Sequence, residues 1–315
     1  MFRHQKLLNT MKHFLPCIFL SLMLISACGT MTFDESTEEE EVATDSGIGE
    51  KTMFFRLTGI TMTDITEMTS GEGNTKAANA AQDGTDNLLL GIYNTDGAIV
   101  GNISYQHKDD PDITYGTFSQ TLKHGKYTIL AIGWNGTQQC HVHSLDSITF
   151  SEGWVPNTFL CLQNIVVSEN FSDTRTLSLK RCVSRFKLTM NDEYIPEGIG
   201  SFHISMGKSS NNLDSRTRHC NHIRTHERTI PVNGELTPPI RVTAYCFLPQ
   251  DSTGVDITIT AYDPDGNPME SKEFTNVPMK INYSTNYSGN FFPYSSESGS
   301  VTFENEFDGE IFHDF

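Results

Sequence analysis

Residues 182–190 read CVSRFKLTM, and this stretch decides the fold class. Apolar Phe186, Leu188 and Met190 occupy every second position, with a polar residue between each pair. Because successive side chains of a β-strand point to opposite faces, this alternation predicts an antiparallel strand with one buried face and one solvated face. The middle of the chain is therefore predicted to be β-structure, and the same signals extend outward from it.

Further strand and turn signals lie on both sides of this stretch. Residues 255–262 alternate in the same way, and residues 127–134 are almost entirely apolar, which suits a central strand. The turn Asn94-Thr95-Asp96-Gly97 is predicted to join strands at 88–93 and 98–105. From residue 51 onward no segment has the apolar period of an amphipathic helix. Short strands separated by turns predict an all-β protein built from β-sandwiches.

Composition and charge limit the class of protein and its partners. The chain has 315 residues, of which 37% are hydrophobic, and its 22 Lys+Arg against 39 Asp+Glu give a net charge of −17. The hydrophobic content is enough for a buried core. The acidic balance argues against nucleic acid, because phosphate binding requires clustered Lys and Arg. We expect no nucleic-acid partner.

The body of the chain is predicted to form two domains with a boundary near residue 180. An N-terminal β-sandwich would span residues 51–180 and a C-terminal one residues 181–315, each roughly the length of a seven-stranded sandwich of about 100 residues plus loops. Residues 69–86 and 208–228 are rich in polar and small residues, so both are predicted to be long loops.

The N-terminus has the layout of a lipoprotein signal. Three basic residues precede an uncharged apolar run at 14–25, which is too short for a permanent membrane-spanning helix. The run ends in Leu24-Ile25-Ser26-Ala27-Cys28-Gly29, which resembles the bacterial lipobox. The resemblance implies a signal peptide at 1–27 and lipidation of Cys28, with two acyl signals sufficient for stable anchoring. The alternative is an ordinary signal peptide in which Cys28 is accidental.

An acidic tether is predicted at residues 28–50. Residues 34–41 read DESTEEEE, and a run of like charge repels itself and stays extended. Acidic residues close behind a lipidated Cys also resemble the surface-export signal of Bacteroidetes lipoproteins. We therefore expect a protein that is lipid-anchored in the outer membrane and exposed at the cell surface.

The remaining cysteines and histidines allow several interpretations. Once the signal peptide leaves and Cys28 is acylated, five cysteines remain, an odd number. At most two disulfides can form among them, and buried free thiols are the alternative. These cysteines are Cys140, Cys161, Cys182, Cys220 and Cys246.

Two clusters offer the side chains that zinc or copper prefers: residues 140–143, and residues 219–222 with His226. A solvated polar loop is the favoured interpretation of the second cluster, and no metal site is predicted. Residues 263–268 resemble the start of a calcium loop, but a hairpin turn explains them, since Pro268 stands where such a loop has Gly.

Four segments carry a family resemblance when taken in order together with the lipobox. They are residues 87–97 (NLLLGIYNTDG), 118–131 (FSQTLKHGKYTILA), 179–186 (LKRCVSRF) and 282–292 (NYSTNYSGNFF). They resemble the fimbrillin-associated anchor and accessory lipoproteins, the minor fimbrial subunits, of Bacteroidales type V pili. The second segment has the family's Leu, two residues, Gly, any residue and Tyr before a buried strand, and the third has an Arg-led strand between domains.

The resemblance implies a fold and a role. The fold would be two tandem transthyretin-like (Greek-key) β-sandwich domains, and the role that of an anchor or accessory subunit in fimbria (pilus) assembly and adhesion. Subunits would join by β-strand addition, so the partners would be fimbrial subunits and, through the lipid, the outer membrane. No cofactor is implied. The tether at 34–50 contains no Arg or Lys, which favours an anchor that keeps its lipid over a shaft subunit.

A surface glycan- or nutrient-binding lipoprotein is the alternative function. It would expose Trp and Tyr beside one set of loops, whereas strand addition would use an apolar groove along a sandwich edge. Trp134 and Trp154 are the two tryptophans, and Trp134 falls in a strand predicted to be buried. The chain lacks GxSxG, HExxH, Walker and GxGxxG motifs, so we do not expect an enzyme.

The C-terminal segment Gly299–Phe315 is predicted to be a terminal strand and tail. Val301 and Phe303 alternate with Thr302 and Glu304, so a short strand with one apolar face can form. Such a strand could complete the chain's own second domain or be donated to a partner. The alternation fits both outcomes.

Overall fold

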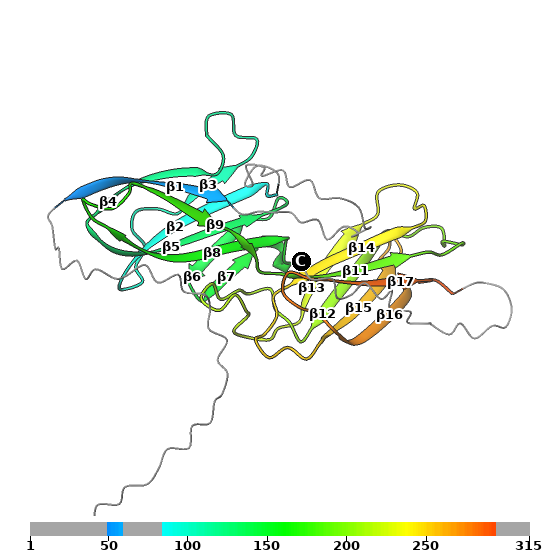
Figure 1. Cartoon of the computed structure of the whole chain (residues 1–315). Helices are drawn as coiled ribbons and strands as arrows, with labels where there is room; N and C mark the ends of the chain where they lie inside the picture. The colour runs from blue at the N-terminus through cyan, green and yellow to red at the C-terminus, as the bar shows by residue number, and fades with distance from the viewer. Residues whose placement is uncertain (1–48, 59–83, 294–315) are drawn as a thin grey trace, which may run out of the picture. The chain divides into compact units, whose positions relative to one another are not determined.

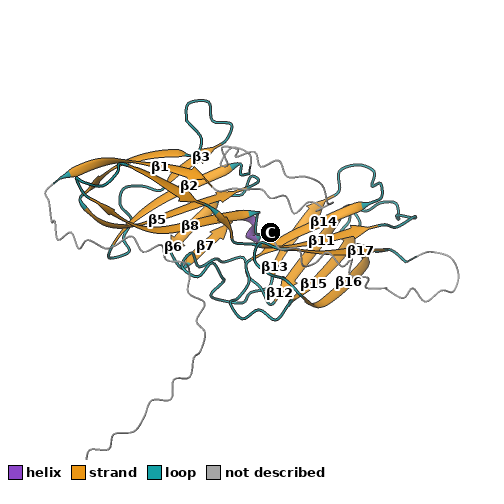
Figure 2. Cartoon of the chain, in the orientation of Figure 1, coloured by secondary structure: helices purple, strands orange, loops and turns teal. Residues whose placement is uncertain are grey.

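The computed structural model describes residues 49–58 and 84–293. These residues form seventeen strands and one short 3₁₀ segment, Ser151–Gly153. Figures 1 and 2 show how the strands are arranged. None of their helices is long and apolar enough to cross a membrane. Cys28, most of the acidic tether, most of the loop at 69–86 and the segment Gly299–Phe315 lie outside the described residues.

Two sheets and a hairpin make up the first half. β1 (Glu50–Thr58), β4 (Thr117–Lys123) and β9 (Thr174–Ser178) form a sheet in the order β4-β1-β9. A five-stranded sheet has the order β10-β8-β5-β2-β3. Its strands are β2 (Asn87–Asn94), β3 (Ser104–His107), β5 (Gly125–Trp134), β8 (Thr158–Val167) and β10 (Lys180–Arg181). The hairpin of β6 (Cys140–Ser144) and β7 (Ser147–Phe150) is inserted between β5 and β8.

The second half repeats this arrangement with seven strands. One sheet has the order β14-β11-β17 and the other the order β13-β12-β15-β16. The strands are β11 (Ser184–Met190), β12 (Ser201–Gly207), β13 (His226–Pro231), β14 (Ile240–Cys246), β15 (Val255–Tyr262), β16 (Pro268–Val277) and β17 (Ser284–Gly289).

The first strand of each half holds the same place in its sheet. β1 is antiparallel to β4 and parallel to β9, and β11 is antiparallel to β14 and parallel to β17. The three-stranded sheet thus joins β1 to β9, the last strand before β10, in the first half, and β11 to β17, the last described strand, in the second. This shared topology is compatible with the proposed boundary near residue 180, which remains a prediction.

The alternating strands bury the faces predicted from sequence. In β11, Phe186, Leu188 and Met190 are buried, and the residues between them are partly exposed. β15 alternates in the same way from Val255 to Ala261. Each half packs its two sheets around an apolar core, one containing Phe55 and Ile129 and the other Phe186 and Ile259. The predicted all-β sandwich class is confirmed.

A third apolar cluster covers the other face of the five-stranded sheet. It joins Ile132 of β5 and Ile148 of β7 to Leu213 and Phe247 of the second half. Ile148 and Leu213 exchange two backbone hydrogen bonds of 2.9 Å, so this contact is also a short piece of sheet. The five-stranded sheet is therefore packed on both faces.

Two sequence predictions need correction. The long loop predicted at 208–228 ends at residue 225, because β13 begins at His226, and it is not solvated throughout, since Leu213 is fully buried and Cys220 is 7% exposed. Both side chains belong to the apolar cluster on the sheet, and backbone hydrogen bonds also join the loop to Ile148 and Phe247. The strand predicted at 98–105 is confined to β3, because residues 99–103 contact β2 through a single bridge at Ile99 and Gly101 has a φ of +75°.

Candidate functional site

β1 is the central strand of the three-stranded sheet in the first half. Its inward side chains Met53, Phe55 and Leu57 are 1%, 0% and 3% exposed. These side chains pack in the apolar core of the first half. The backbone of β1 lies between β4, with which Glu50–Arg56 pair, and β9, with which Phe54–Thr58 pair. Without β1, those two strands would flank an open apolar groove. The chain therefore occupies its own groove in the first half.

The second half is closed at its C-terminal end by the residues after β17. The buried Asp192 carboxylate accepts the backbone N–H groups of Phe291, at 3.0 Å, and Phe292, at 2.7 Å. Both phenyl rings are buried in the core of this half. The chain thus completes its own sandwich up to Phe292. The role predicted for Gly299–Phe315 stays a prediction, since that segment lies outside the described residues.

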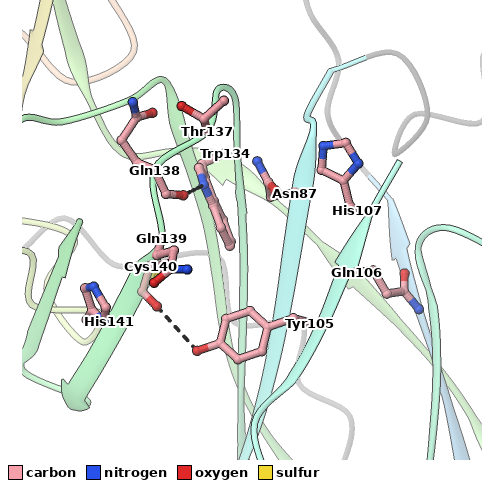
Figure 3. Close-up of a pocket in the computed structure, with 10 residues that line it drawn as sticks. All are labelled: Asn87, Tyr105, Gln106, His107, Trp134, Thr137, Gln138, Gln139, Cys140 and His141. Carbon is pink, nitrogen blue, oxygen red and sulfur yellow. Dashed lines mark hydrogen bonds between the residues drawn. The ribbon is translucent and has the colours of Figure 1, made fainter. Parts of the chain in front are cut away.

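A cavity of about 490 Å³ opens at one end of the five-stranded sheet (Figure 3). The strand register explains its base, because His107, Asn87 and Trp134 form one row across β3, β2 and β5. Tyr105 stands opposite Leu89 on the same face of the sheet. The lining residues are Asn87, Tyr105, Gln106, His107, Trp134, Thr137, Gln138, Gln139, Cys140 and His141.

Hydrogen bonds fix the walls of this cavity. The Trp134 indole N–H donates to the Gln138 carbonyl at 2.7 Å, and the Tyr105 hydroxyl donates to the Cys140 carbonyl at 3.3 Å. The Asn87 side-chain amide donates to the Gly136 carbonyl at 2.7 Å. These bonds tie the segment after β5 to β2 and β3, and Figure 3 shows the Tyr105 ring reaching toward Cys140.

Trp134 and Tyr105 differ in how far they are exposed to solvent. Trp134 is 3% exposed, whereas Tyr105 is 56% exposed and is the accessible ring. Partial burial raises the pKa of Tyr105, and the nearby Cys140 thiol adds to this. The phenol therefore stays neutral at physiological pH. Sequence reasoning missed this cavity, because its residues come from four strands and a loop and share no spacing.

The five cysteines within the described residues are free and buried: Cys140, Cys161, Cys182, Cys220 and Cys246. Burial raises the pKa of all five thiols, to about 12 for Cys182 and Cys246. A thiol that stays protonated is neither a nucleophile nor a metal ligand. The structure thus shows the buried free thiols that the sequence left open, and these cysteines act as small apolar core residues.

The two histidine clusters do not assemble into metal sites within the described residues, where no three His, Cys, Asp or Glu side chains could jointly hold an ion. His219 lies 3.3 Å from the Leu248 carbonyl, His222 is exposed, and His226 is buried against the Tyr245 carbonyl. The calcium-like residues 263–267 form the hairpin turn between β15 and β16, as predicted.

His226 gives the fold a predicted pH dependence. Burial lowers the pKa of His226. Hydrogen bonds with the backbone of Tyr245 and Arg224 raise the pKa and so oppose this effect only in part. The unfolded state, with a pKa of about 6.5, takes up a proton at a higher pH than the folded state does. The stability that comes from His226 being neutral is therefore fully present above about pH 6.5, and it is lost as the pH falls toward the lowered pKa of the folded state.

The measurement compares urea unfolding at several values between pH 7.5 and 5.5. We expect the free energy of unfolding of the wild type to fall more steeply than that of His226→Gln, which cannot take up this proton. His222→Gln, at an exposed position of the same segment, should follow the wild type. Parallel curves for the wild type and His226→Gln would contradict the assignment.

Comparisons with known proteins add the following. A family of unknown function (DUF6562) matches residues 208–314, less than half of the chain. No curated protein matches the sequence. A candidate adhesin from Bacteroides ovatus has a similar solved structure, with 11% identity and a TM-score of 0.49, covering 77% of this chain and 92% of that one.

Two further solved structures are similar at the same low level. A candidate polysaccharide-binding protein from Bacteroides thetaiotaomicron is 10% identical, with a TM-score of 0.46, covering 76% of this chain and 90% of that one. The fimbrial anchor protein Mfa2 from Porphyromonas gingivalis is 9% identical, with a TM-score of 0.39, covering 76% and 91%. The function of this chain has to be argued from its own residues.

Proposed function

We propose that this chain is a non-enzymatic, lipid-anchored surface protein that serves as an anchor or accessory subunit in fimbria assembly and adhesion. The observation that carries the proposal is the place of β1. The lipobox-like motif at 24–29 and the acidic tether lead directly into this strand, which fills the groove between β4 and β9. Its membrane attachment and its closed groove thus belong to one continuous segment.

A closed groove suits the end of a filament better than its shaft. A shaft subunit joined by strand addition needs an open groove that accepts a strand from its neighbour. Here an incoming strand would have to displace Met53, Phe55 and Leu57, and burying such side chains stabilises a fold by roughly 1.5–3 kcal/mol each. The first half is therefore unsuited to accepting a strand from another subunit. In this proposal the N-terminal end of the chain is attached to the membrane instead of to a preceding subunit.

The experiment that tests this proposal is the substitution Cys28→Ala in the bacterium that makes the protein. Without the thiol the lipid has no attachment point. We expect labelled palmitate to be absent from the variant, the protein to leave the outer-membrane fraction, and filaments to be released into the medium. Cys17→Ala, inside the signal peptide, is the matched control and should retain all three properties.

The possible outcomes test the acylation of Cys28 and the role in fimbria assembly separately. Label that still enters Cys28→Ala would overturn the assignment of the acylated residue. Loss of the label with filaments that keep their attachment and length would leave the acylation intact but reject the role in fimbria assembly.

A further inference from the structure

The cavity beside β3, β5 and β6 has the features of a ligand site. We propose that it binds a neutral saccharide. This inference goes beyond the filament role proposed above and rests on the cavity alone, so each can fail without the other. Saccharide binding in this cavity would also provide the means by which the proposed surface protein adheres.

The charge of the lining sets the class of ligand. None of the ten lining residues is Asp, Glu, Lys or Arg, and the two histidines, His107 and His141, supply imidazoles that can hydrogen-bond to hydroxyls. Lys108 and Asp86 lie close by, but they neutralise each other at 2.6 Å. A charged ligand would lose its hydration in such a site without gaining a counter-charge. A neutral, hydroxyl-rich molecule avoids that cost.

The polar groups suit hydroxyl partners. Side-chain amides both donate and accept hydrogen bonds, as adjacent hydroxyls of a sugar require. The Asn87 side-chain amide N–H donates to the Gly136 carbonyl. This bond fixes the amide, and the Asn87 side-chain oxygen serves as the acceptor for a ligand hydroxyl. Thr137 and Gln139 add a hydroxyl and a second amide to the lining.

Tyr105 provides the apolar surface that a sugar ring needs. Its ring is 56% exposed and is fixed by the hydroxyl bond to the Cys140 carbonyl, as Figure 3 shows. One face of a pyranose carries C–H groups that pack against an aromatic ring, while its edge hydroxyls bond to amides. An aromatic body with a polar tip serves both kinds of contact.

Size and rigidity complete the argument. About 490 Å³ falls in the range of roughly 300–1,000 Å³ that is typical of small-molecule sites, and it admits a short oligosaccharide. The walls are already held by the bonds at Trp134, Asn87 and Tyr105. A preformed site orders few side chains on binding, which reduces the entropic cost.

The test uses the mature full-length protein on an array of neutral oligosaccharides of hexoses and N-acetylhexosamines, followed by titration of the retained ones. We expect retention of at least one class, and an affinity loss of about tenfold or more in Tyr105→Ala. Tyr105→Phe keeps the ring and should stay within a few-fold of the wild type. Tyr194→Ala removes a similarly exposed ring outside the cavity lining, so it should bind as the wild type does.

Three results would overturn the proposal. One is no retention on any neutral oligosaccharide of the array. A second is retention that Tyr105→Ala leaves unchanged while its melting temperature matches the wild type, which places binding elsewhere. The third is an equal loss in Tyr105→Ala and Tyr194→Ala, which indicates nonspecific adsorption by exposed rings.

Discussion

Replacing Phe186 with Ala is expected to lower the free energy of unfolding by about 3–5 kcal/mol, the cost of truncating a buried aromatic side chain. Phe186 is fully buried in β11, and its ring lies 5.6 Å from both the Phe274 and Tyr287 rings. These three rings come from both sheets of the second half. The truncation therefore leaves a cavity that neither sheet can close alone.

The neighbouring residue in the same strand gives the control. Arg185 is partly exposed on the opposite face, and its Nε donates to the Ser284 hydroxyl at 2.9 Å. Arg185→Ala should cost less than about 1 kcal/mol, as is usual for surface positions. Urea unfolding followed by circular dichroism measures both variants. Similar losses would mean that the two faces of β11 are assigned wrongly.

Leu213→Ala is expected to lower the free energy of unfolding by about 2–5 kcal/mol, a value typical of buried leucines. Leu213 belongs to the second half of the sequence but is fully buried in the cluster on the five-stranded sheet of the first half. Its backbone is bonded to Ile148 in both directions. The loss should therefore appear in the unfolding of the first half as well.

The same loop supplies a matched control. Ile223 is 63% exposed, so Ile223→Ala should change stability by less than about 0.5 kcal/mol. Trp134 lies in the same cluster as Leu213. In a Trp154→Phe background its fluorescence reports on the first half during urea unfolding. If Leu213→Ala were no more destabilising than Ile223→Ala, the assignment that residues 208–225 pack on the five-stranded sheet would be wrong.

Half-buried strands were the part of the fold that sequence could predict. In β11 and β15 every second residue is apolar, and the structure buries those residues because a strand that separates a core from water imposes that period. The turn at 94–97 was equally legible, since Gly97 adopts the positive φ of +76° for which glycine is suited. Local chemistry decides these features.

Contacts between distant residues were beyond sequence reasoning. The parallel pairing of β1 with β9 joins segments more than a hundred residues apart, and nothing local in either strand specifies it. The burial of Leu213 and Cys220 was not predicted, because the average polarity of the loop that contains them hides these two residues. The cavity was missed for a similar reason, since Tyr105 of β3 and Trp134 of β5 meet only after β2 pairs with both strands.

The parallel pairing of β1 and β9 has a mechanical consequence. In the proposed role, tension enters at the N-terminal end of β1 through the tether and leaves at the C-terminal end of β9 through the chain that leads to β11. Two parallel strands pulled from opposite ends slide along each other, and their evenly spaced hydrogen bonds share the load instead of opening one after another. A pulling force thus meets the first half in the direction in which a β-sheet resists best.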